Sequence, residues 1–249
     1  MSLKRLAKNL LQSANVEVGL TKPYPEKVAG MPHRRSFPLA TYAPWLADKE
    51  FQTIFERIRQ NTLVDEYRCW ELYTLAQQMA KLPAGDVLEV GVWRGGTGCL
   101  IARAMQDSNQ PRTIYLADTF EGVVKASEED TGYRGGEHSD TSKDVVLGLA
   151  KDLALTNIQI LQGIFPEDTA HEVEASQFVL CHIDVDVYQS ALDVFEWVWP
   201  RLQSGGVVVF DDYGFYGCEG VTKLVNELAL RPDLLFVHNL NGHALLVKR

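Results

Sequence analysis

Apolar residues recur every three or four positions in two early segments of the chain, which is the spacing of an amphipathic helix. In the first segment the apolar positions are Phe51, Ile54, Phe55 and Ile58. Asp48 precedes them and belongs to the residue types that cap helix N-termini, so the helix is expected to begin there. A second helix is predicted from about Asp65 to Lys81, because Pro83 and Gly85 follow it.

From residue 86 onwards, short apolar runs alternate with helical patterns. The runs that have the length of buried strands are 86–91, 113–118, 158–161, 178–184 and 207–211. The helical patterns cover about 96–105, 143–153, 188–202 and 219–229. Two last strands, 235–238 and 244–247, flank Asn241-Gly242, a dipeptide typical of β-hairpins. This order predicts an α/β, doubly wound, mostly parallel sheet with helices on both faces and a C-terminal antiparallel hairpin at one edge.

The first 47 residues have a different character. Five of the ten prolines lie before residue 45, so this stretch cannot be one continuous helix. Residues 1–40 hold seven Lys or Arg and two Glu, a local net charge of +5. We interpret residues 1–47 as a basic, Pro-rich arm that serves as a lid, as part of a substrate pocket or as a contact between subunits. Residues 48–249 are then one domain with a helical N-terminal cap.

Composition excludes several classes of protein. The 249 residues carry 24 Lys+Arg and 33 Asp+Glu, a formal net charge of −9 that argues against broad nucleic-acid binding. The four cysteines are widely spaced and form no CxxC pair, so we expect free, buried thiols in a reducing cytoplasm. No apolar stretch approaches the roughly 20 residues of a membrane span, and the N-terminus lacks the pattern of a secretory signal. A cytoplasmic protein without a membrane partner is expected.

Glycines and acids gather at the carboxyl ends of the first two strands, which is where doubly wound sheets bind ligands. The first strand ends in a turn that contains Gly91 and Gly95, where a ligand can approach the backbone closely. The spacing is not GxGxxG, which weakens a dinucleotide-binding interpretation. Asp118 ends the second strand and can accept hydrogen bonds from ribose hydroxyls, while Glu89 lies at the ligand side of the first. The set predicts a nucleoside-containing cofactor, and a tight turn without a ligand is the alternative.

Four acids close the fourth and fifth strands of the parallel sheet, and these strands are expected to be neighbours. Asp184 and Asp186 follow one strand, and Asp211 and Asp212 follow the other. Carboxylates brought together repel one another, and no Lys or Arg lies beside them in the sequence. A divalent cation with oxygen ligands such as Mg²⁺ resolves the repulsion, and an acidic cleft compensated by basic residues from elsewhere is the alternative.

The same acids suggest a reaction. A bound metal would lower the pKa of a substrate hydroxyl, and Asp186 could accept the proton. On a straight strand Asp184 and Asp186 would point the same way, so their roles could be exchanged. His182 also lies on that side, but the simpler interpretation is a packed core histidine.

Several ordered motifs together resemble the macrocin O-methyltransferase family, from about Thr62 to the C-terminus. They are Glu89-Val-Gly-Val-Trp-Arg-Gly-Gly, Ala117-Asp-Thr-Phe-Glu-Gly122, Gln162-Gly-Ile-Phe-Pro166, Ile183-Asp-Val-Asp-Val-Tyr188, Pro200-Arg-Leu with Gly205-Gly206, and Asp211-Asp-Tyr-Gly214. Enzymes of that family methylate sugar hydroxyls on macrolide and aminocoumarin natural products. The resemblance implies a Rossmann-like class I methyltransferase sheet, S-adenosylmethionine as the methyl donor, Mg²⁺, a small-molecule hydroxyl acceptor and a homo-oligomer.

The resemblance also assigns roles by position. It implies that Glu89, Gly91 and Asp118 contact the cofactor, that Asp184, Asp211 and Asp212 ligate the metal, and that Asp186 or Asp184 is the base. Many relatives have Asp-Gly-Asp where this chain has Val185 between the two acids.

Other functions compete with this one. A catechol or other phenol is the main alternative acceptor, although the small catechol enzymes have a lysine soon after the aspartate that corresponds to Asp184, and Val185-Asp186-Val187 stands there. A metal-dependent glycosyltransferase would use the Asp184-x-Asp186 pattern but leaves Asp211 and Asp212 without a role. A dehydrogenase and a non-catalytic binding domain fit less well.

Overall fold

The computed structural model describes residues 27–34, 40–106 and 110–249, and the chain divides into two compact units, residues 1–34 and 35–249. In the first unit, β1 (Lys27–Val28) pairs antiparallel with β2 (Met31–Pro32). Most of the basic arm predicted for residues 1–47 lies outside the described residues, so its role as a lid stays a prediction. Among the described residues, no helix has the length and apolar character needed to cross a membrane.

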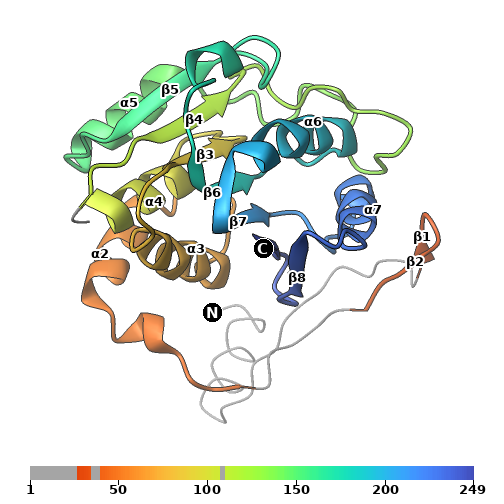
Figure 1. Cartoon of the computed structure of the whole chain (residues 1–249), viewed down its shortest axis with the longest axis horizontal. Helices are drawn as coiled ribbons and strands as arrows, with labels where there is room; N and C mark the ends of the chain where they lie inside the picture. The colour runs from red at the N-terminus through yellow and green to blue at the C-terminus, as the bar shows by residue number, and fades with distance from the viewer. Residues whose placement is uncertain (1–26, 35–39, 107–109) are drawn as a thin grey trace, which may run out of the picture. The chain divides into compact units, whose positions relative to one another are not determined.

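The second unit is built on one seven-stranded sheet, shown in Figure 1. Its strands are β3 (Asp86–Val90), β4 (Ile114–Asp118), β5 (Ile158–Gln162), β6 (Phe178–Ile183), β7 (Leu202–Phe210), β8 (Leu234–His238) and β9 (Ala244–Lys248). Their order is β5-β4-β3-β6-β7-β9-β8, and all neighbours are parallel except for the pairs that include β9. The predicted doubly wound sheet and its C-terminal hairpin are confirmed, and the hairpin is joined by the loop 239–243, which contains Asn241-Gly242.

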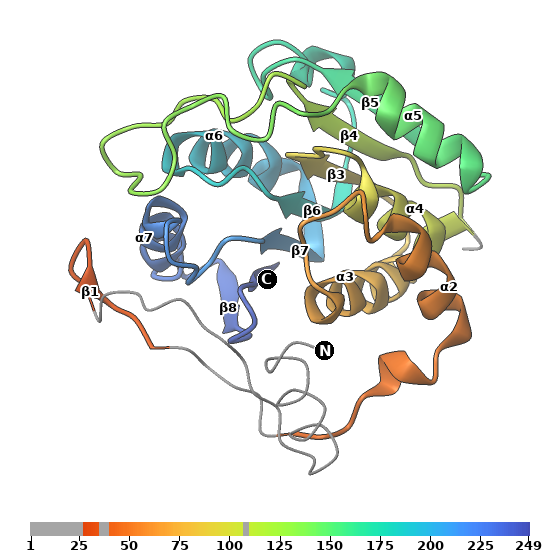
Figure 2. The same ribbon diagram turned by 180° about the vertical axis from the view of Figure 1, so that it is seen from behind.

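Helices flank the sheet where the periodicity predicts them. They are α2 (Lys49–Ile58), α3 (Glu66–Met79), α4 (Gly96–Gln106), α5 (Lys143–Asp152), α6 (Tyr188–Val198) and α7 (Glu219–Leu228), with 3₁₀ turns η1 (Pro44–Leu46), η2 (Ala170–Glu172) and η3 (Trp199–Arg201). Asp48 caps α2 through a hydrogen bond from the Phe51 N–H, and Asp65 caps α3. Figures 1 and 2 show α6 and α7 grouped together, away from α3 and α4.

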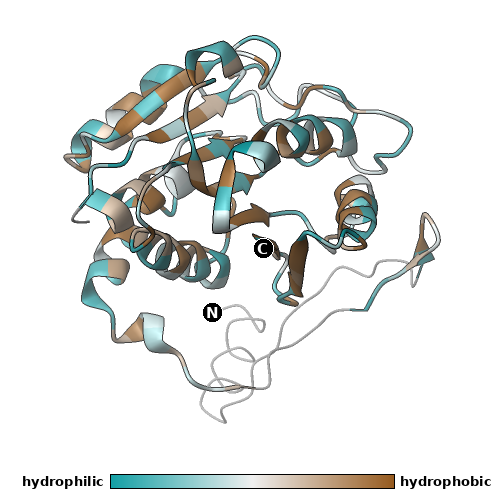
Figure 3. Ribbon diagram, viewed as in Figure 1, coloured by the Kyte–Doolittle hydropathy of each residue, from teal (hydrophilic) through white to brown (hydrophobic). Residues whose placement is uncertain are grey.

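Alternation along each strand divides the core between the two faces of the sheet. Leu88 and Val90 of β3 pack with residues of α6 and α7. Val87, from the same strand, packs on the opposite face with residues of α3 and α4. A third cluster joins α2, α3 and α4. Figure 3 shows this pattern as hydrophobic residues along the strands and along one side of the helices.

All four cysteines are buried and free, as the sequence predicts.

Candidate active site at the carboxyl edge of the sheet

A cavity of about 290 Å³ opens at the carboxyl ends of β3, β4, β6 and β7. It lies where the strand order reverses between β3 and β6, the position at which doubly wound sheets bind their ligands. Six of the eight predicted site residues line it, namely Gly91, Asp118, Asp184, Asp186, Asp211 and Asp212. The other two, Glu89 and Gly95, do not line it. Other parts of its wall come from residues 61–64, from the connection between β4 and α5, from residues 163–165, from α3, α4 and α6, and from Phe215, Tyr216 and Cys218.

The glycine turn after β3 brings two strand ends close together. Gly91 has a φ of +89°, and a Cβ at this position would overlap the backbone carbonyl of Asp184 at the end of β6. Only glycine allows this approach of the two strand ends. Gly95, with a φ of +83°, serves packing instead, because a Cβ there would lie 2.7 Å from the side chain of Val146 on α5.

Asp118 holds the glycine turn from the end of β4. Its Oδ2 accepts hydrogen bonds from the N–H groups of Val92 (2.7 Å) and Trp93 (2.8 Å). Its Oδ1 accepts one from the N–H of Phe120 at 2.7 Å. An ionised carboxylate offers about four lone-pair sites, so the described contacts leave one on Oδ1 that could accept a ribose hydroxyl. Asp118 therefore has a structural role that the sequence did not indicate, beside its predicted contact with the cofactor.

Glu89 lies under the cavity floor. Its side chain is fully buried, and Oε1 lies 2.8 Å from Nδ1 of His182 on the neighbouring strand. A Cβ on Gly98 would overlap Oε2, so α4 closes over the carboxylate. His182 is also fully buried and does not line the cavity, which agrees with its interpretation as a packed core histidine. Burial opposes protonation of His182, but the neighbouring Asp211 and Glu89 carboxylates raise its pKa to about 10.

The predicted acids of β6 and β7 converge. One carboxylate oxygen each of Asp184, Asp211 and Asp212 lies within 4.8 Å of the other two. Burial and the neighbouring charges of Asp211 and Asp212 raise the pKa of Asp184 well above its ordinary value. Burial and the charges of Asp186 and Asp211 do the same to the pKa of Asp212. Both groups thus lie where an added positive charge would stabilise their ionised forms.

Asp211 differs from its neighbours because basic groups surround it. Arg68 of α3 donates a hydrogen bond from Nη1 to Oδ2. On the other side, Nε2 of His243 lies 2.8 Å from Oδ1, and Nε2 of His182 lies 3.7 Å from the same atom. Burial opposes ionisation of Asp211, but His182, His243 and the charge of Arg68 lower its pKa below its ordinary value. Basic residues from elsewhere in the chain, the alternative to a metal, therefore compensate one of the three acids.

Asp186 does not continue the strand. β6 ends at Ile183, and Asp186 has a φ of +65°, so Asp184 and Asp186 are not related by strand alternation as expected for a straight strand. The backbone N–H of Asp186 donates to Asp212 Oδ2 at 3.1 Å. Its side chain accepts a hydrogen bond from Tyr133, and its Oδ2 lies 4.0 Å from Nε2 of His138. Burial raises the pKa of Asp186, which moves it toward the range of a general base.

The connection between β4 and α5, residues 119–142, is fastened to the domain at several points. Asp130 is buried and accepts hydrogen bonds from the N–H groups of Tyr188 and Ser127, at 2.8 and 2.9 Å. A Cβ on Gly220 would overlap Asp130 Oδ1, so this anchor requires glycine at the start of α7. Lys125 makes ion pairs with Glu167 and Asp193. These contacts fix the connection as a wall of the cavity, which places Tyr133 and His138 beside Asp186.

The carboxylate oxygens of Asp184, Asp211 and Asp212, which we call the acid cluster, fit a hard divalent cation. Asp184 and Asp212 present carboxylate oxygens without a guanidinium partner among the described residues. Cys218 lies beside them, with Sγ 3.7 Å from Asp212 Oδ1. Burial and the Asp212 carboxylate raise the pKa of the Cys218 thiol, which stays protonated and donates to the carboxylate. The ligands are therefore oxygens, and Mg²⁺ prefers oxygen ligands and keeps several waters.

Sequence reasoning missed four residues of the site, namely Arg68, Tyr133, His138 and His243. The sequence could have indicated the contact between Arg68 and Asp65, because residues three positions apart lie on the same side of a helix. His243 follows the hairpin dipeptide, but nothing in the sequence indicates that the loop folds back toward Asp211. Tyr133 and His138 lie in a long polar connection without periodicity.

Comparisons with known proteins point to one family. A model of the macrocin-O-methyltransferase (TylF) family matches residues 59–234. The chain is 32% identical over 151 residues to mycinamicin III 3''-O-methyltransferase of Micromonospora griseorubida, a match that covers 54% of this chain and 57% of that protein. It is 30% identical over 163 residues to demethyldecarbamoylnovobiocin O-methyltransferase of Streptomyces niveus, covering 60% of each. The chain thus spans less than two thirds of the length of these relatives.

Solved structures agree at the level of the fold. The O-methyltransferase NovP superposes with a TM-score of 0.60 at 24% identity, over 76% of this chain and 82% of that one. The calicheamicin methyltransferase CalS11 superposes with a TM-score of 0.62 at 19% identity, over 80% of this chain and 93% of that one.

Proposed function

Because the chain belongs to the macrocin O-methyltransferase family, we propose that it transfers the methyl group of S-adenosylmethionine, with Mg²⁺, to a hydroxyl of a sugar or a glycosylated natural product. The relatives whose names give mycinamicin III and demethyldecarbamoylnovobiocin as the methylated compounds support this class of acceptor. One observation carries the proposal: the glycine turn with Asp118 and the acids of β6 and β7 line a single cavity. A donor and an acceptor can therefore meet in one space.

The cofactor end of the cavity is the turn after β3. Gly91 lets the backbone approach a ligand closely, and the remaining lone pair of Asp118 Oδ1 is suited to a ribose hydroxyl. Glu89 and Gly95 do not line the cavity. Glu89 contacts His182 behind the cavity wall, and Gly95 allows the turn after β3 to pack on α5. Their proposed part in cofactor binding is thus to shape the turn that the cofactor contacts.

The metal end of the cavity is the acid cluster. Asp184, Asp211 and Asp212 would hold Mg²⁺, with water or the acceptor in the remaining positions. When bound, the ion would lower the pKa of a hydroxyl that it contacts, which makes a sugar alcohol a better nucleophile. Asp186 is the proposed base, because it lies at the cavity wall with a raised pKa and is held by Tyr133. Asp184 is the less suitable base because its carboxylate faces the other ligands.

Methyl transfer requires the acceptor oxygen in line with the sulfonium methyl group, so positioning is the main task of the protein. The fixed connection 119–142 and the aromatic rings of Phe215 and Tyr216 form the wall on the acceptor side. Arg68, which also lines the cavity, is bound to Asp211. The wall itself holds the aromatic rings of Tyr133, Phe215 and Tyr216 beside the aliphatic side chains of Val123 and Val124. Such a surface suits the uncharged face of a sugar ring.

The test is transfer of a labelled methyl group from S-adenosylmethionine to a panel of glycosides and catechols. We expect products methylated on a sugar hydroxyl, with turnover lost in Asp211→Ala while the demethylated cofactor still binds. If only catechols are methylated, the acceptor is a phenol and the proposed sugar acceptor is wrong. Loss of cofactor binding in a folded Asp211→Ala protein would contradict the division between cofactor end and metal end.

We also propose that the chain forms a homo-oligomer. Residues 1–40 carry a net charge of +5, and since the whole chain carries −9, the remainder carries −14. A basic arm on one subunit is attracted by an acidic body on another. Light scattering at several concentrations, with and without residues 1–40, is expected to give a smaller mass for the shortened chain. An unchanged mass would contradict a role of the arm in assembly.

A further inference from the structure

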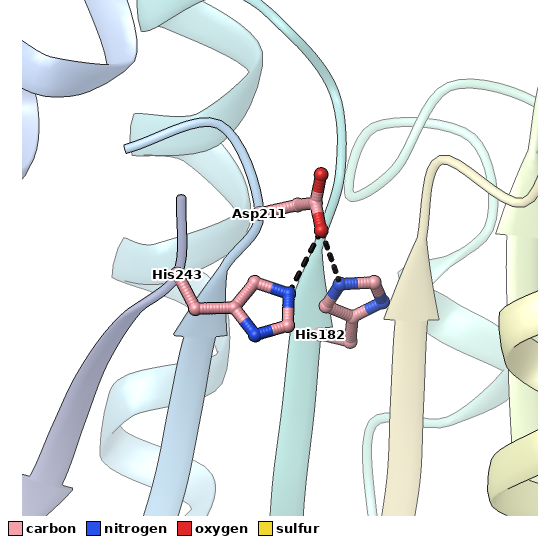
Figure 4. Close-up of side chains that lie close together, drawn as sticks. All are labelled: His182, Asp211 and His243. Carbon is pink, nitrogen blue, oxygen red and sulfur yellow. Dashed lines mark hydrogen bonds and ion pairs between the residues drawn. The ribbon is translucent and has the colours of Figure 1, made fainter. Parts of the chain in front are cut away.

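A row of buried polar side chains crosses the sheet beneath helix α3. Glu89 of β3 and His182 of β6 are paired in register. His182 is in turn paired with Val209 of β7, so Asp211, two residues later, points to the same face. His243 precedes β9 and reaches Asp211 from the other side. Figure 4 shows the rings of His182 and His243 directed toward one oxygen of Asp211.

Both oxygens of the Asp211 carboxylate contact basic side chains, namely those of His182, His243 and Arg68. Oδ1 lies 2.8 Å from Nε2 of His243 and 3.7 Å from Nε2 of His182. Oδ2 accepts a hydrogen bond from Arg68, which in turn donates from Nε to Asp65 at 2.8 Å. The carboxylate group is 4% exposed, so water cannot replace these partners easily. Its rotation is therefore set by side chains that come from three different elements.

Glu71 of α3 controls the histidine on one side of this carboxylate. Its Oε2 lies 2.8 Å from Nδ1 of His243. The same side chain accepts hydrogen bonds from the amide groups of Asn239 and Asn241. Glu71 thereby fastens the loop 239–243 to α3, and it orients the imidazole ring that contacts Asp211. Glu71, His243 and Asp211 thus form a chain of side-chain contacts, carboxylate to histidine to carboxylate, that ends at the acid cluster. We call these three residues the relay.

We propose that Glu71 and His243 are positioning residues that hold Asp211 in the orientation in which it ligates the metal. The inference rests on the proposed function, since it needs Asp211 as a ligand. The physical reason is preorganisation: a carboxylate held by fixed partners loses less conformational freedom when it binds a cation. Partners of this kind behind a metal ligand typically change metal affinity about 10- to 100-fold when they are removed.

Neither Glu71 nor His243 lines the cavity, and His243 reaches the acid cluster through its contact with Asp211. The cofactor end is formed by Asp118 and the turn after β3, which the relay does not contact among the described residues. Metal affinity and cofactor affinity therefore report on two separate parts of the cavity. A merely structural role of the relay would lower thermal stability and would affect both affinities or neither.

The experiment measures Mg²⁺ affinity by calorimetry, and Mn²⁺ affinity by electron paramagnetic resonance, in the otherwise intact chain. The variants are His243→Asn, Glu71→Ala and Glu71→Gln. Affinity for S-adenosylhomocysteine is measured in each as the internal reference. We expect metal affinity to fall about 10- to 100-fold in the first two variants and less in Glu71→Gln, which keeps an oxygen acceptor, with cofactor affinity unchanged. Glu71→Gln also keeps the test open if the harsher variants fail to fold.

Matched controls are His171→Asn and Glu174→Gln, which change exposed residues near η2 and are expected to leave metal affinity unchanged. Metal affinity within about twofold of the wild type in all three relay variants would overturn the inference, provided that Asp212→Asn abolishes metal binding. If the wild-type protein itself binds no Mg²⁺ or Mn²⁺ at these acids, the metal in the proposed function is wrong, and the inference fails with it. The Asp212→Asn comparison separates these two failures.

Discussion

Replacing Asp118 by alanine removes three hydrogen bonds at once. Its carboxylate accepts the N–H groups of Val92, Trp93 and Phe120 at distances of 2.7, 2.8 and 2.7 Å. A buried donor that loses its partner costs about 1–3 kcal/mol. Asp118 is half-buried, so water can reach part of the gap, and we expect Asp118→Ala to lower the free energy of unfolding by about 2–4 kcal/mol.

The same change should weaken the cofactor site. Trp93 has a φ of +47°, and its N–H is one of the three donors, so the turn is free to relax when the carboxylate is removed. Together with the lost acceptor for a ribose hydroxyl, this predicts an affinity for S-adenosylhomocysteine about 10- to 100-fold lower. Mg²⁺ affinity should change little, because Asp118 does not belong to the acid cluster.

Urea unfolding and calorimetric titration measure the two effects. Asp118→Asn is the milder variant: it keeps an oxygen for Val92 and Trp93 but turns an amide donor toward the N–H of Phe120. Asp152→Ala, at the exposed end of α5, is the matched control and should lie within about 0.5 kcal/mol of the wild type. A folded Asp118→Ala protein with wild-type cofactor affinity would refute the assignment of Asp118 to the cofactor site.

Three further predictions test the walls of the cavity. Gly91→Ala should lower the free energy of unfolding, measured in urea, by more than about 3 kcal/mol. The reason is that residue 91 has a positive φ and the added Cβ would overlap the Asp184 carbonyl. A melting temperature within a few degrees of the wild type would contradict this. Gly220→Ala should cost about 2 kcal/mol by displacing Asp130 and should raise the KM for the acceptor, and an unchanged KM would argue against a fixed wall. The pKa of Asp212 is raised in the folded, metal-free protein. At pH values between the ordinary and the raised pKa, the folded protein therefore binds more protons than the unfolded chain, and the folded state loses stability as pH rises. Asp212→Asn should therefore gain stability relative to the wild type as pH rises from about 4 to 8 without metal, and a constant difference would contradict the raised pKa.

Much of the fold follows from the sequence because each element carries a local signal. Asp48 caps α2 as predicted, and α3 begins next to Asp65, where the second helix is expected to start. The apolar runs end within a few residues of the ends of the observed strands. The convergence of Asp184 with Asp211 was predictable as well, since consecutive strands of a doubly wound sheet tend to be neighbours.

The side-chain directions were harder to predict. Strand alternation puts Glu89 on the face of the sheet covered by α4, so it pairs with His182 under the cavity instead of lining it. Asp186 departs from the alternation because the chain turns at a positive φ. Two partners of Asp211, Arg68 and His243, come from α3 and from the loop after β8, and how a helix face or a long loop meets a strand end depends on tertiary packing. Local patterns do not contain that information.

The most direct test of the proposed function is calorimetric titration of the purified chain with S-adenosylmethionine and S-adenosylhomocysteine, each with Mg²⁺ and with a chelator. We predict that both bind, and that Mg²⁺ binds separately at the acids of β6 and β7 and is lost in Asp212→Asn. Binding of neither compound, together with metal-dependent binding of a nucleotide-sugar, would contradict the methyltransferase assignment and favour a glycosyltransferase.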